Sequence, residues 1–147
     1  MIREFVKSDL IPMMAIEHVA HAVPWTEETF KMCLQSHYIG WVLELDKKII
    51  GFVIVTMEDI ECHILNLCVI PHHQHQGWGR KLLEHVVMEA KQCGVGIVYL
   101  EVRRTNSRAI SLYQKLDFHL VGERKGYYPV VSGQEDALIY AKSLSES

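Results

Sequence analysis

The segment from Val69 to Arg80 constrains this chain more than any other part of the sequence. It reads Val-Ile-Pro-His-His-Gln-His-Gln-Gly-Trp-Gly-Arg. Mostly apolar residues at 64–70 precede it and predict a strand. Apolar residues at helical spacing follow it, at Leu82, Leu83, Val86, Val87 and Ala90. A strand that turns through glycine into a helix directs backbone N–H groups and the positive end of the helix dipole toward one point. The segment therefore predicts a site for an anion such as a pyrophosphate.

The two glycines of this segment strengthen that interpretation. Gly77 and Gly79 lack Cβ atoms, so a ligand can approach the backbone closely. The segment is not a Walker A motif, because no Gly-Lys-Ser/Thr follows. It is not a Rossmann fingerprint, because the nearby Gly94-Val-Gly96 precedes a strand rather than opening a helix. On these residues alone, an ordinary strand-to-helix turn is the alternative.

Length and composition narrow the class of protein. The 147 residues predict a single domain spanning 1–147, and 49% hydrophobic with 22% charged residues is typical of globular proteins. Since no apolar run reaches about 18 residues, we expect no membrane span and no membrane partner. The net charge of −3 argues against direct nucleic-acid binding, although a local basic patch stays possible. Residues 1–7 lack the apolar core of a signal sequence, so we expect a cytoplasmic protein.

The four cysteines do not form a recognisable framework. Cys33, Cys62, Cys68 and Cys93 include no Cys-x-x-Cys pair, and their neighbours are largely apolar. We expect buried thiols in a reducing compartment, without disulfides.

Apolar patterns, caps and turn residues predict the element order β-α-α-β-β-β-α-β-α-β-β. Strands are expected at 2–6, 40–45, 49–57, 62–70, 97–102, 118–124 and 136–142. Helices are expected from a cap at Ser8 to Ala20, from a cap at Thr26 to Leu34, from Gly79 to a left-handed cap at Gly94, and from a cap at Asn106 or Ser107 to Leu116. This order predicts an α/β fold whose sheet has mixed strand directions.

Two residues on the later elements are candidates for proton transfer. Glu101 stands within an otherwise apolar strand, where a carboxylate is costly unless it has a partner or a task. It is either a general base or the partner of a cation such as Arg103 or Arg104. Tyr113 lies on the apolar stripe of the following helix, so by default it is a core aromatic with a solvated hydroxyl. Only a specific context would make it a proton donor.

The histidines and the loop aromatics give weaker signals. His72, His73 and His75, with His63 nearby, fit no common zinc spacing, so we expect no metal. Trp25, Tyr38 and Tyr127 lie in expected loops or at strand ends. They either line a groove for an extended peptide or anchor their loops against the core.

Taken together, these segments resemble the GNAT N-acetyltransferases, which use acetyl-coenzyme A. Gln74-His-Gln-Gly-Trp-Gly79 matches the family's Q/R-x-x-G-x-G/A pyrophosphate loop, and Asn106 and Tyr113 match its N-x-x-A-x-x-L-Y segment. The resemblance covers nearly the whole chain. It implies a single-domain fold with a mixed, mostly antiparallel central sheet flanked by helices.

Three segments are similar to the bacterial Rim-type branch, which acetylates the N-terminal alanine of a small-subunit ribosomal protein. They are residues 20–30, Leu100-Glu-Val-Arg-Arg-Thr-Asn106 and Tyr127-Tyr-Pro-x-x-x-Gly-x-Glu-Asp-Ala137. By this resemblance, Glu101 is the general base and Tyr113 the general acid. The resemblance also implies that acetyl-coenzyme A is held by Leu67, Cys68, Val69, His75, Gln76, Gly77, Trp78, Gly79, Arg80 and Asn106.

Three positions depart from the pattern. Leu116-Asp117-Phe118 replaces the family's Leu-Gly-Phe, and Asp tolerates the left-handed conformation better than most residues. Trp78 stands where a smaller or aliphatic residue is common. Tyr140 stands where this branch often has Met.

The expected reaction is direct acetyl transfer to a protein N-terminus, with no cysteine acyl-enzyme. A free α-amine is roughly one-tenth neutral at pH 7, whereas a lysine ε-amine is neutral in about one part in a thousand or less. One modest base therefore serves an α-amine more easily. The alternatives are acetylation of a lysine side chain or small-molecule amine, and a non-catalytic module that binds coenzyme A. The sequence leaves the oligomeric state open.

Overall fold

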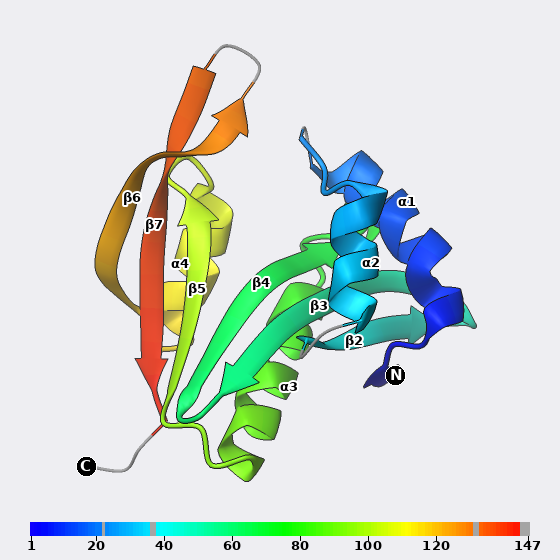
Figure 1. Cartoon of the computed structure of the whole chain (residues 1–147), viewed down its shortest axis with the longest axis horizontal. Helices are drawn as coiled ribbons and strands as arrows, with labels where there is room; N and C mark the ends of the chain where they lie inside the picture. Colours follow the sequence, from blue (N-terminus) through cyan, green and yellow to red (C-terminus); the bar gives the residue numbers. More distant parts are fainter. Residues whose placement is uncertain (22, 36–37, 131–132, 145–147) are drawn as a thin grey trace.

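A seven-stranded sheet forms the centre of the described chain (Figure 1). The computed structural model describes all residues except 22, 36–37, 131–132 and 145–147, and only the backbone at 35, 127–130 and 133–135. In sheet order the strands are β1 (Ile2–Glu4), β2 (Tyr38–Leu45), β3 (Lys48–Glu58), β4 (Glu61–Val69), β5 (Ile97–Arg103), β7 (Gly133–Ser143) and β6 (His119–Val130). Only β4 and β5 are parallel neighbours among these. The predicted mixed, mostly antiparallel sheet is confirmed.

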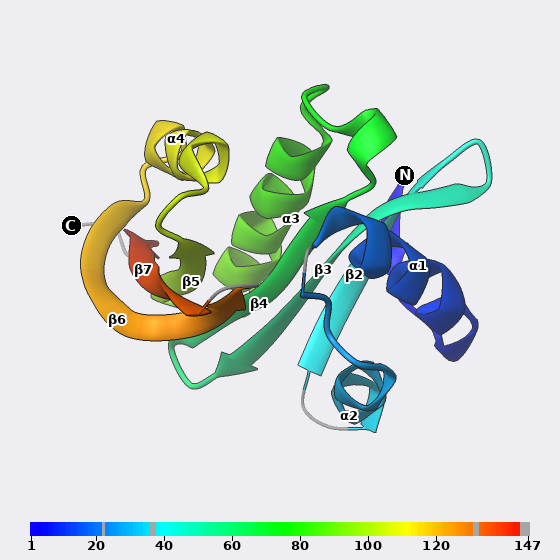
Figure 2. The same cartoon turned by 90° about the horizontal axis from the view of Figure 1, so that it is seen from above.

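Helices cover both faces of this sheet. The helices α3 (Trp78–Gln92) and α4 (Ser107–Lys115) lie on one face, and α1 (Leu10–Ala20) and α2 (Glu27–Gln35) lie on the other (Figure 2). Two short 3-10 turns, η1 (Lys7–Asp9) and η2 (Pro71–His73), precede α1 and α3. Apart from these turns, the element order is the predicted one.

Each face has its own apolar core. Leu82, Leu83 and Val86 of α3 pack on one side of the sheet, and Met13, Ile16 and Phe30 of α1 and α2 pack on the other. Because both faces are covered, β3 is buried without interruption from residue 50 to 55.

The cap predicted at Ser8 is wrong. A 3-10 turn intervenes, and α1 begins at Leu10 after Asp9. The Asp9 carboxylate accepts hydrogen bonds from Arg3 at 2.8 and 3.0 Å and from the Val6 N–H at 2.8 Å. These bonds, Arg3 foremost, lower the pKa of Asp9 although burial opposes them. The ion pair ties β1 to the start of α1, a contact that local sequence does not reveal.

Other local predictions are confirmed. The Thr26 hydroxyl accepts the Thr29 N–H at 3.2 Å at the start of α2. Gly94 has a φ of +80° after α3, and Asp46 and Lys47 have positive φ in the β2–β3 hairpin.

Two further expectations concern membranes and cysteines. Among the described residues, none of the helices has the length and apolarity needed to span a bilayer. All four cysteines are free, and Cys33, Cys62 and Cys68 are buried as expected. Cys93 is exposed at the end of α3, so its expected burial is wrong.

Asp117 offers a test of backbone strain. It has a φ of +66° between α4 and β6, and its side chain is 82% exposed, with only a 3.9 Å ion pair to Lys142. Glycine adopts this conformation without a Cβ penalty, and an exposed ion pair contributes little. We expect Asp117→Gly to raise the free energy of unfolding by about 0.5–1 kcal/mol in urea denaturation. Asp117→Ala should lower it, and a Gly variant less stable than the Ala variant would contradict this account.

Candidate functional site

The parallel strands β4 and β5 separate partway along their length. Their ladder runs only from Glu61 and Ile97 to Ile64 and Leu100. Leu65 is an extra residue in β4, because the pairing with β3 shifts between Ile54 and Val55 at this point. Beyond it the two strands diverge, which Figure 1 shows as an open V between β4 and β5. The divergence leaves one edge of β4 without a β5 partner along residues 65–69.

A cavity of about 550 Å³ lies where the strands diverge. It is lined by Glu17, His21, Val23, Pro24, Trp25, Thr26, Thr29, Ile64, Leu65, Asn66, Leu67, Leu100, Glu101, Val102, Arg103, Asn106 and Tyr113. The fold thus brings together the two proton-transfer candidates and the predicted residues Trp25, Leu67 and Asn106. We call this cavity the central cleft.

Glu101 is less buried than its apolar neighbours suggested. Strand β5 alternates, so Val98, Leu100 and Val102 are buried, whereas the Glu101 side chain is 28% exposed and lines the central cleft. Its Oε1 lies 3.4 Å from Nε of Arg124 on β6. The cation partner is therefore Arg124. Arg104, one of the candidates, instead contacts Glu123 and lies 3.4 Å from Asp136.

Tyr113 lies on α4, where it packs against the core and lines the central cleft. The residue is 8% exposed and packs near Phe118 and Tyr140, with ring centroids 6.2 and 6.4 Å away. Burial raises the pKa of its hydroxyl to about 12. The hydroxyl is therefore protonated at neutral pH, as a proton donor must be.

The glycine loop, residues 70–80, joins the end of β4 to α3. The Gln74 side-chain amide donates to the Val69 carbonyl at 2.8 Å and fastens the loop to β4. Gly77 has a φ of +89° and is the N-cap of α3, where no side chain accepts a hydrogen bond. The N–H groups of the first turn therefore point out of the helix end without partners inside the helix. This geometry is suited to an anion, and anion binding stays a prediction.

Gly79 has no packing reason to be glycine. A Cβ placed on it would meet no atom within 4 Å, and its φ lies outside the positive range. Alanine is favoured over glycine inside helices, so the fold itself gains nothing from this residue. Open space at the anion-binding end of α3 suits the close approach of a ligand.

The remaining predicted loop residues occupy different positions. Trp78 is half-buried against the core, and its Nε1 donates to Gln76 at 3.2 Å. His75 has a φ of +66° and contacts Arg108, which links the glycine loop to α4. Arg80 is exposed and lies 3.5 Å from Glu84 one turn later.

Asn106, rather than Ser107, is the N-cap of α4. Its side-chain oxygen accepts the Ala109 N–H at 3.2 Å, and the residue lines the central cleft. The cap fixes the helix that carries Tyr113. A direct contact between Asn106 and a cofactor stays a prediction.

The three predicted β4 residues differ in their surroundings. Leu67 is half-buried and lines the central cleft, while Cys68 and Val69 are buried. The Cys68 side chain packs in the core beneath α1 and α2. Burial raises the pKa of its thiol to about 12, so it is a poor nucleophile at neutral pH. This agrees with the expectation that no cysteine acyl-enzyme forms.

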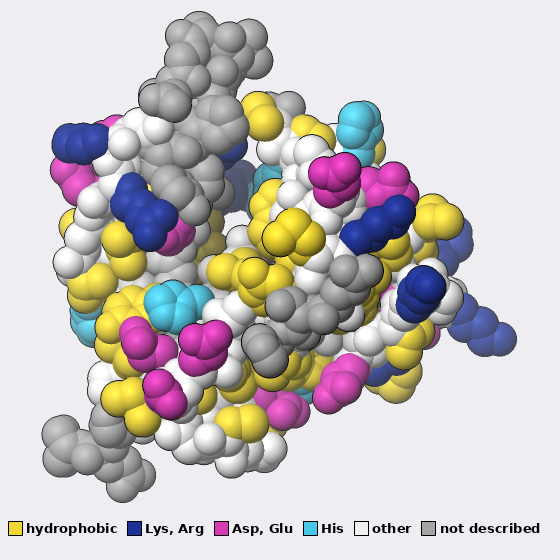
Figure 3. All heavy atoms as spheres, viewed as in Figure 1, with side chains coloured by type: hydrophobic (Ala, Val, Ile, Leu, Met, Phe, Trp, Pro, Cys, Tyr) yellow, Lys and Arg dark blue, Asp and Glu magenta, His cyan; other side chains and the backbone are white. Residues whose placement is uncertain are grey.

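A second cavity of about 660 Å³ adjoins the cleft on the other side of Glu101. It is lined by Trp25, Thr29, Met32, Cys33, Tyr38, Thr56, His63, Ile64, Leu65, Tyr99, Leu100, Glu101, Arg124 and Ile139. Figure 3 shows the surface hollowed between the β5–β7 arm and the side that carries α1 and α2, with hydrophobic side chains in the middle of this face. Trp25 lines both cavities and Tyr38 lines the second. The Tyr127 side chain lies outside the described residues.

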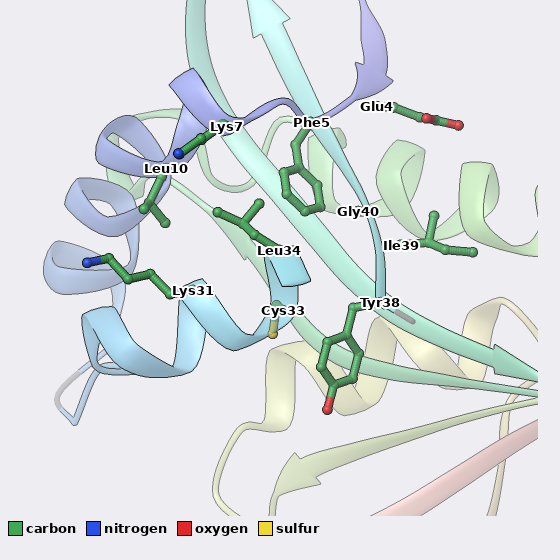
Figure 4. Close-up of a pocket in the computed structure, with 10 residues that line it drawn as sticks. All are labelled: Glu4, Phe5, Lys7, Leu10, Lys31, Cys33, Leu34, Tyr38, Ile39 and Gly40. Carbon is green, nitrogen blue, oxygen red and sulfur yellow. The ribbon is translucent and has the colours of Figure 1, made fainter. Parts of the chain in front are cut away.

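A third cavity, of about 770 Å³, lies beyond Tyr38 between β1, β2 and the helices α1 and α2. Figure 4 shows Phe5, Leu10 and Leu34 on its walls, with the Tyr38 hydroxyl pointing away from them. Phe5 packs on Gly40, where an added Cβ would come within 2.3 Å of the ring. Tyr38 and Cys33 line both this cavity and the one beside Glu101.

Sequence reasoning missed a buried polar cluster on α1. Glu17 is 1% exposed, and its carboxylate accepts hydrogen bonds from Asn66 and from the Trp25 N–H. His21 lies 2.7 Å from the same carboxylate. A signal was present, because Glu17 follows Met13 by one helical turn on the apolar stripe of α1.

The loop histidines do not gather as metal ligands. Among described residues, the His, Cys, Asp and Glu donors close enough to share an ion are Glu17, His21 and Cys68. The Glu17 oxygens already face three hydrogen-bond donors, and the Cys68 thiol keeps its proton. These contacts favour a hydrogen-bonded cluster over a metal site at Glu17, His21 and Cys68.

This chain is similar to known proteins along most of its length. Residues 8–118 match the acetyltransferase (GNAT) family. The ribosomal protein bS18-alanine N-acetyltransferase of Escherichia coli (strain K12) is 40% identical over 138 residues, which cover 94% of this chain and 93% of that protein. The enzyme of the same name from Haemophilus influenzae is 37% identical over 134 residues, covering 90% and 91%.

A solved structure agrees with these sequence matches. The crystal structure of the Escherichia coli ribosomal-protein-S18-alanine N-acetyltransferase superimposes with a TM-score of 0.94 at 38% identity, covering all of this chain and 95% of that one. The divergent strands, the glycine loop and the family match agree, and the chain belongs to the GNAT family of acetyltransferases.

Proposed function

We propose that this protein transfers the acetyl group of acetyl-coenzyme A to the N-terminal α-amine of an alanine, on ribosomal protein bS18. The observation that carries the proposal is near-full-length similarity, 40% over 94% of the chain, to an enzyme with that activity. The central cleft supports it, because Glu101 and Tyr113 both line it. The reaction would take place in the cytoplasm, and the free cysteines suit a reducing compartment.

The glycine loop and the open edge of β4 are suited to hold acetyl-coenzyme A. The N–H groups at the start of α3, with the helix dipole, would bind the pyrophosphate. The backbone of residues 67–69 would pair with the pantetheine arm. Gln74 fastens the loop to Val69, so these two binding surfaces are held in fixed relation.

Glu101 and Tyr113, on opposite sides of the reacting thioester, would carry out the proton transfers. Glu101, directly or through a water, accepts a proton from the substrate ammonium group, and the neutral amine attacks the thioester carbonyl. Backbone N–H groups near Val69 stabilise the developing oxyanion. As the carbon–sulfur bond breaks, Tyr113 donates its proton to the coenzyme A thiolate, and the nitrogen releases its remaining extra proton to solvent as the amide forms.

The second cavity is the proposed groove for the rest of the peptide. It opens from Glu101, and Trp25 and Tyr38 provide aromatic walls on the α2 side. Tyr127, whose side chain lies outside the described residues, stays a predicted residue of this groove. A GNAT enzyme acting on a lysine side chain or small amine is the alternative, since both substrates present an amine to the same base.

A peptide panel separates these substrates. We expect acetylation, followed by mass spectrometry, of a free N-terminal peptide beginning with alanine, and at most trace product when the α-amine is blocked and a lysine is present. The α-amine supplies far more neutral nucleophile at pH 7. Equal rates on free and blocked peptides would reject N-terminal specificity.

Removal of the proposed base should slow the reaction without unfolding the protein. Glu101→Gln keeps the side-chain shape, so we expect kcat to fall by about 10²–10⁴ with an unchanged melting temperature. Glu61→Gln on the neighbouring strand serves as the matched control and should retain activity. A Glu101→Gln enzyme with turnover close to that of the wild type would remove Glu101 from this role.

The glycine loop allows a test that separates ligand binding from stability. The space at Gly79 admits a side chain, and an acid in the first turn of a helix favours the dipole, so Gly79→Asp should keep or raise the melting temperature. Its carboxylate would repel the pyrophosphate. We expect KM for acetyl-coenzyme A to rise about tenfold or more, an effect of about 1.4 kcal/mol or more. Gly79→Ala adds the Cβ without the charge and should raise KM less than Gly79→Asp does. An unchanged KM in the Asp variant would place the pyrophosphate elsewhere.

A further inference from the structure

Glu17 joins three segments that line the central cleft. Its carboxylate accepts the Trp25 N–H at 2.8 Å from the α1–α2 link, and the Asn66 side-chain amide at 3.0 Å from β4. His21 Nδ1, at the end of α1, lies 2.7 Å away. Figure 2 shows the link running beside β4. All three partners, and Glu17 itself, line the cleft that contains Glu101 and Tyr113.

This carboxylate carries a charge in a buried position. Burial acts to raise the pKa of Glu17, but the hydrogen bonds from His21, Trp25 and Asn66 outweigh it and hold the pKa below its usual value. A buried ion pair is often no more stabilising than apolar residues of the same volume. The rest of the α1 stripe, with Met13 and Ile16, is apolar. Core packing alone therefore does not require an acid here.

The hydrogen bond between His21 and Glu17 defines which ring nitrogen of His21 is available to a ligand. Because ionised Glu17 can only accept, Nδ1 of His21 carries the proton toward it. In the neutral ring, Nε2 is then an acceptor. The His21 side chain is 39% exposed and lines the cleft, so a ligand can reach it.

We propose that His21 is a further substrate-binding residue, whose Nε2 accepts a hydrogen bond from the terminal ammonium group of the incoming protein, and that Glu17 is the positioning residue that fixes its ring. His21 acts from the α1 side of the cleft, while Glu101 acts from β5. The ammonium group has three N–H donors and can satisfy both. This inference rests on the proposed N-terminal acetyltransferase function.

Two peptides test the contact directly. One begins with alanine. The other replaces that alanine with a propionyl group, which keeps the carbon chain and lacks only the amine. Binding of each to the protein saturated with coenzyme A is measured by calorimetry, and KM for the alanine peptide and for acetyl-coenzyme A is measured kinetically.

We expect His21→Ala to weaken binding of the alanine peptide about tenfold or more, as for a hydrogen bond to a charged group. Binding of the propionyl peptide and KM for acetyl-coenzyme A should stay within about twofold. His21→Gln should recover part of the loss, because its amide oxygen can accept. Glu17→Gln should show a smaller loss of the same selectivity. His18→Ala, an exposed histidine on the same helix, should behave as the wild type.

If His21→Ala weakens binding of both peptides equally, His21 only shapes the cleft wall and does not contact the ammonium group. If His21→Ala weakens binding of neither peptide, the proposal is also overturned. Because the His21 ring is partly exposed, its variants carry the test even if Glu17→Gln does not fold. A wild-type protein that neither binds nor acetylates the alanine peptide would instead reject the proposed function.

Discussion

The separation of β4 from β5 is the constraint on which the site depends. Four residue pairs hold the two parallel strands together, and the bulge at Leu65 then turns β4 away. Every feature of the central cleft follows from this divergence. It frees one edge of β4, gives Glu101 a solvated side on β5, and lets Tyr113 reach the same space from α4. The residues between the strands are therefore positioned by backbone pairing, which short-range sequence patterns do not encode.

Local patterns predicted much of the fold. Glycines with positive φ, the Thr26 and Asn106 caps and alternating apolar strands act over a few residues, so the element order and the helix ends at Gly94 and Leu116 follow from sequence. The Ser8 cap failed because Asp9 bonds to Arg3, a partner on another strand. Likewise, Arg124 pairs with Glu101 only because β5, β7 and β6 lie side by side.

The site was predictable where a residue's role is set by its neighbours in the chain. Gly77 and Gly79 indicate the geometry of an anion site, because a turn and a helix end are local structures. Glu17 was missed for the opposite reason, since its partners on β4 and the α1–α2 link are brought to it by tertiary packing. Its acidic side chain on an apolar stripe was the available signal.

The two cores differ in how far they extend across the sheet. The core beneath α3 and α4 includes Val53 of β3, Leu100 of β5 and Tyr140 of β7, so it crosses the divergence. The described core beneath α1 and α2 draws its buried residues from those helices and from β2, β3 and β4. The core beneath α3 and α4 therefore joins the strands on both sides of the divergence. Its amide hydrogens can be protected from exchange as one cooperative unit, while α1 and α2 can open locally without breaking that unit.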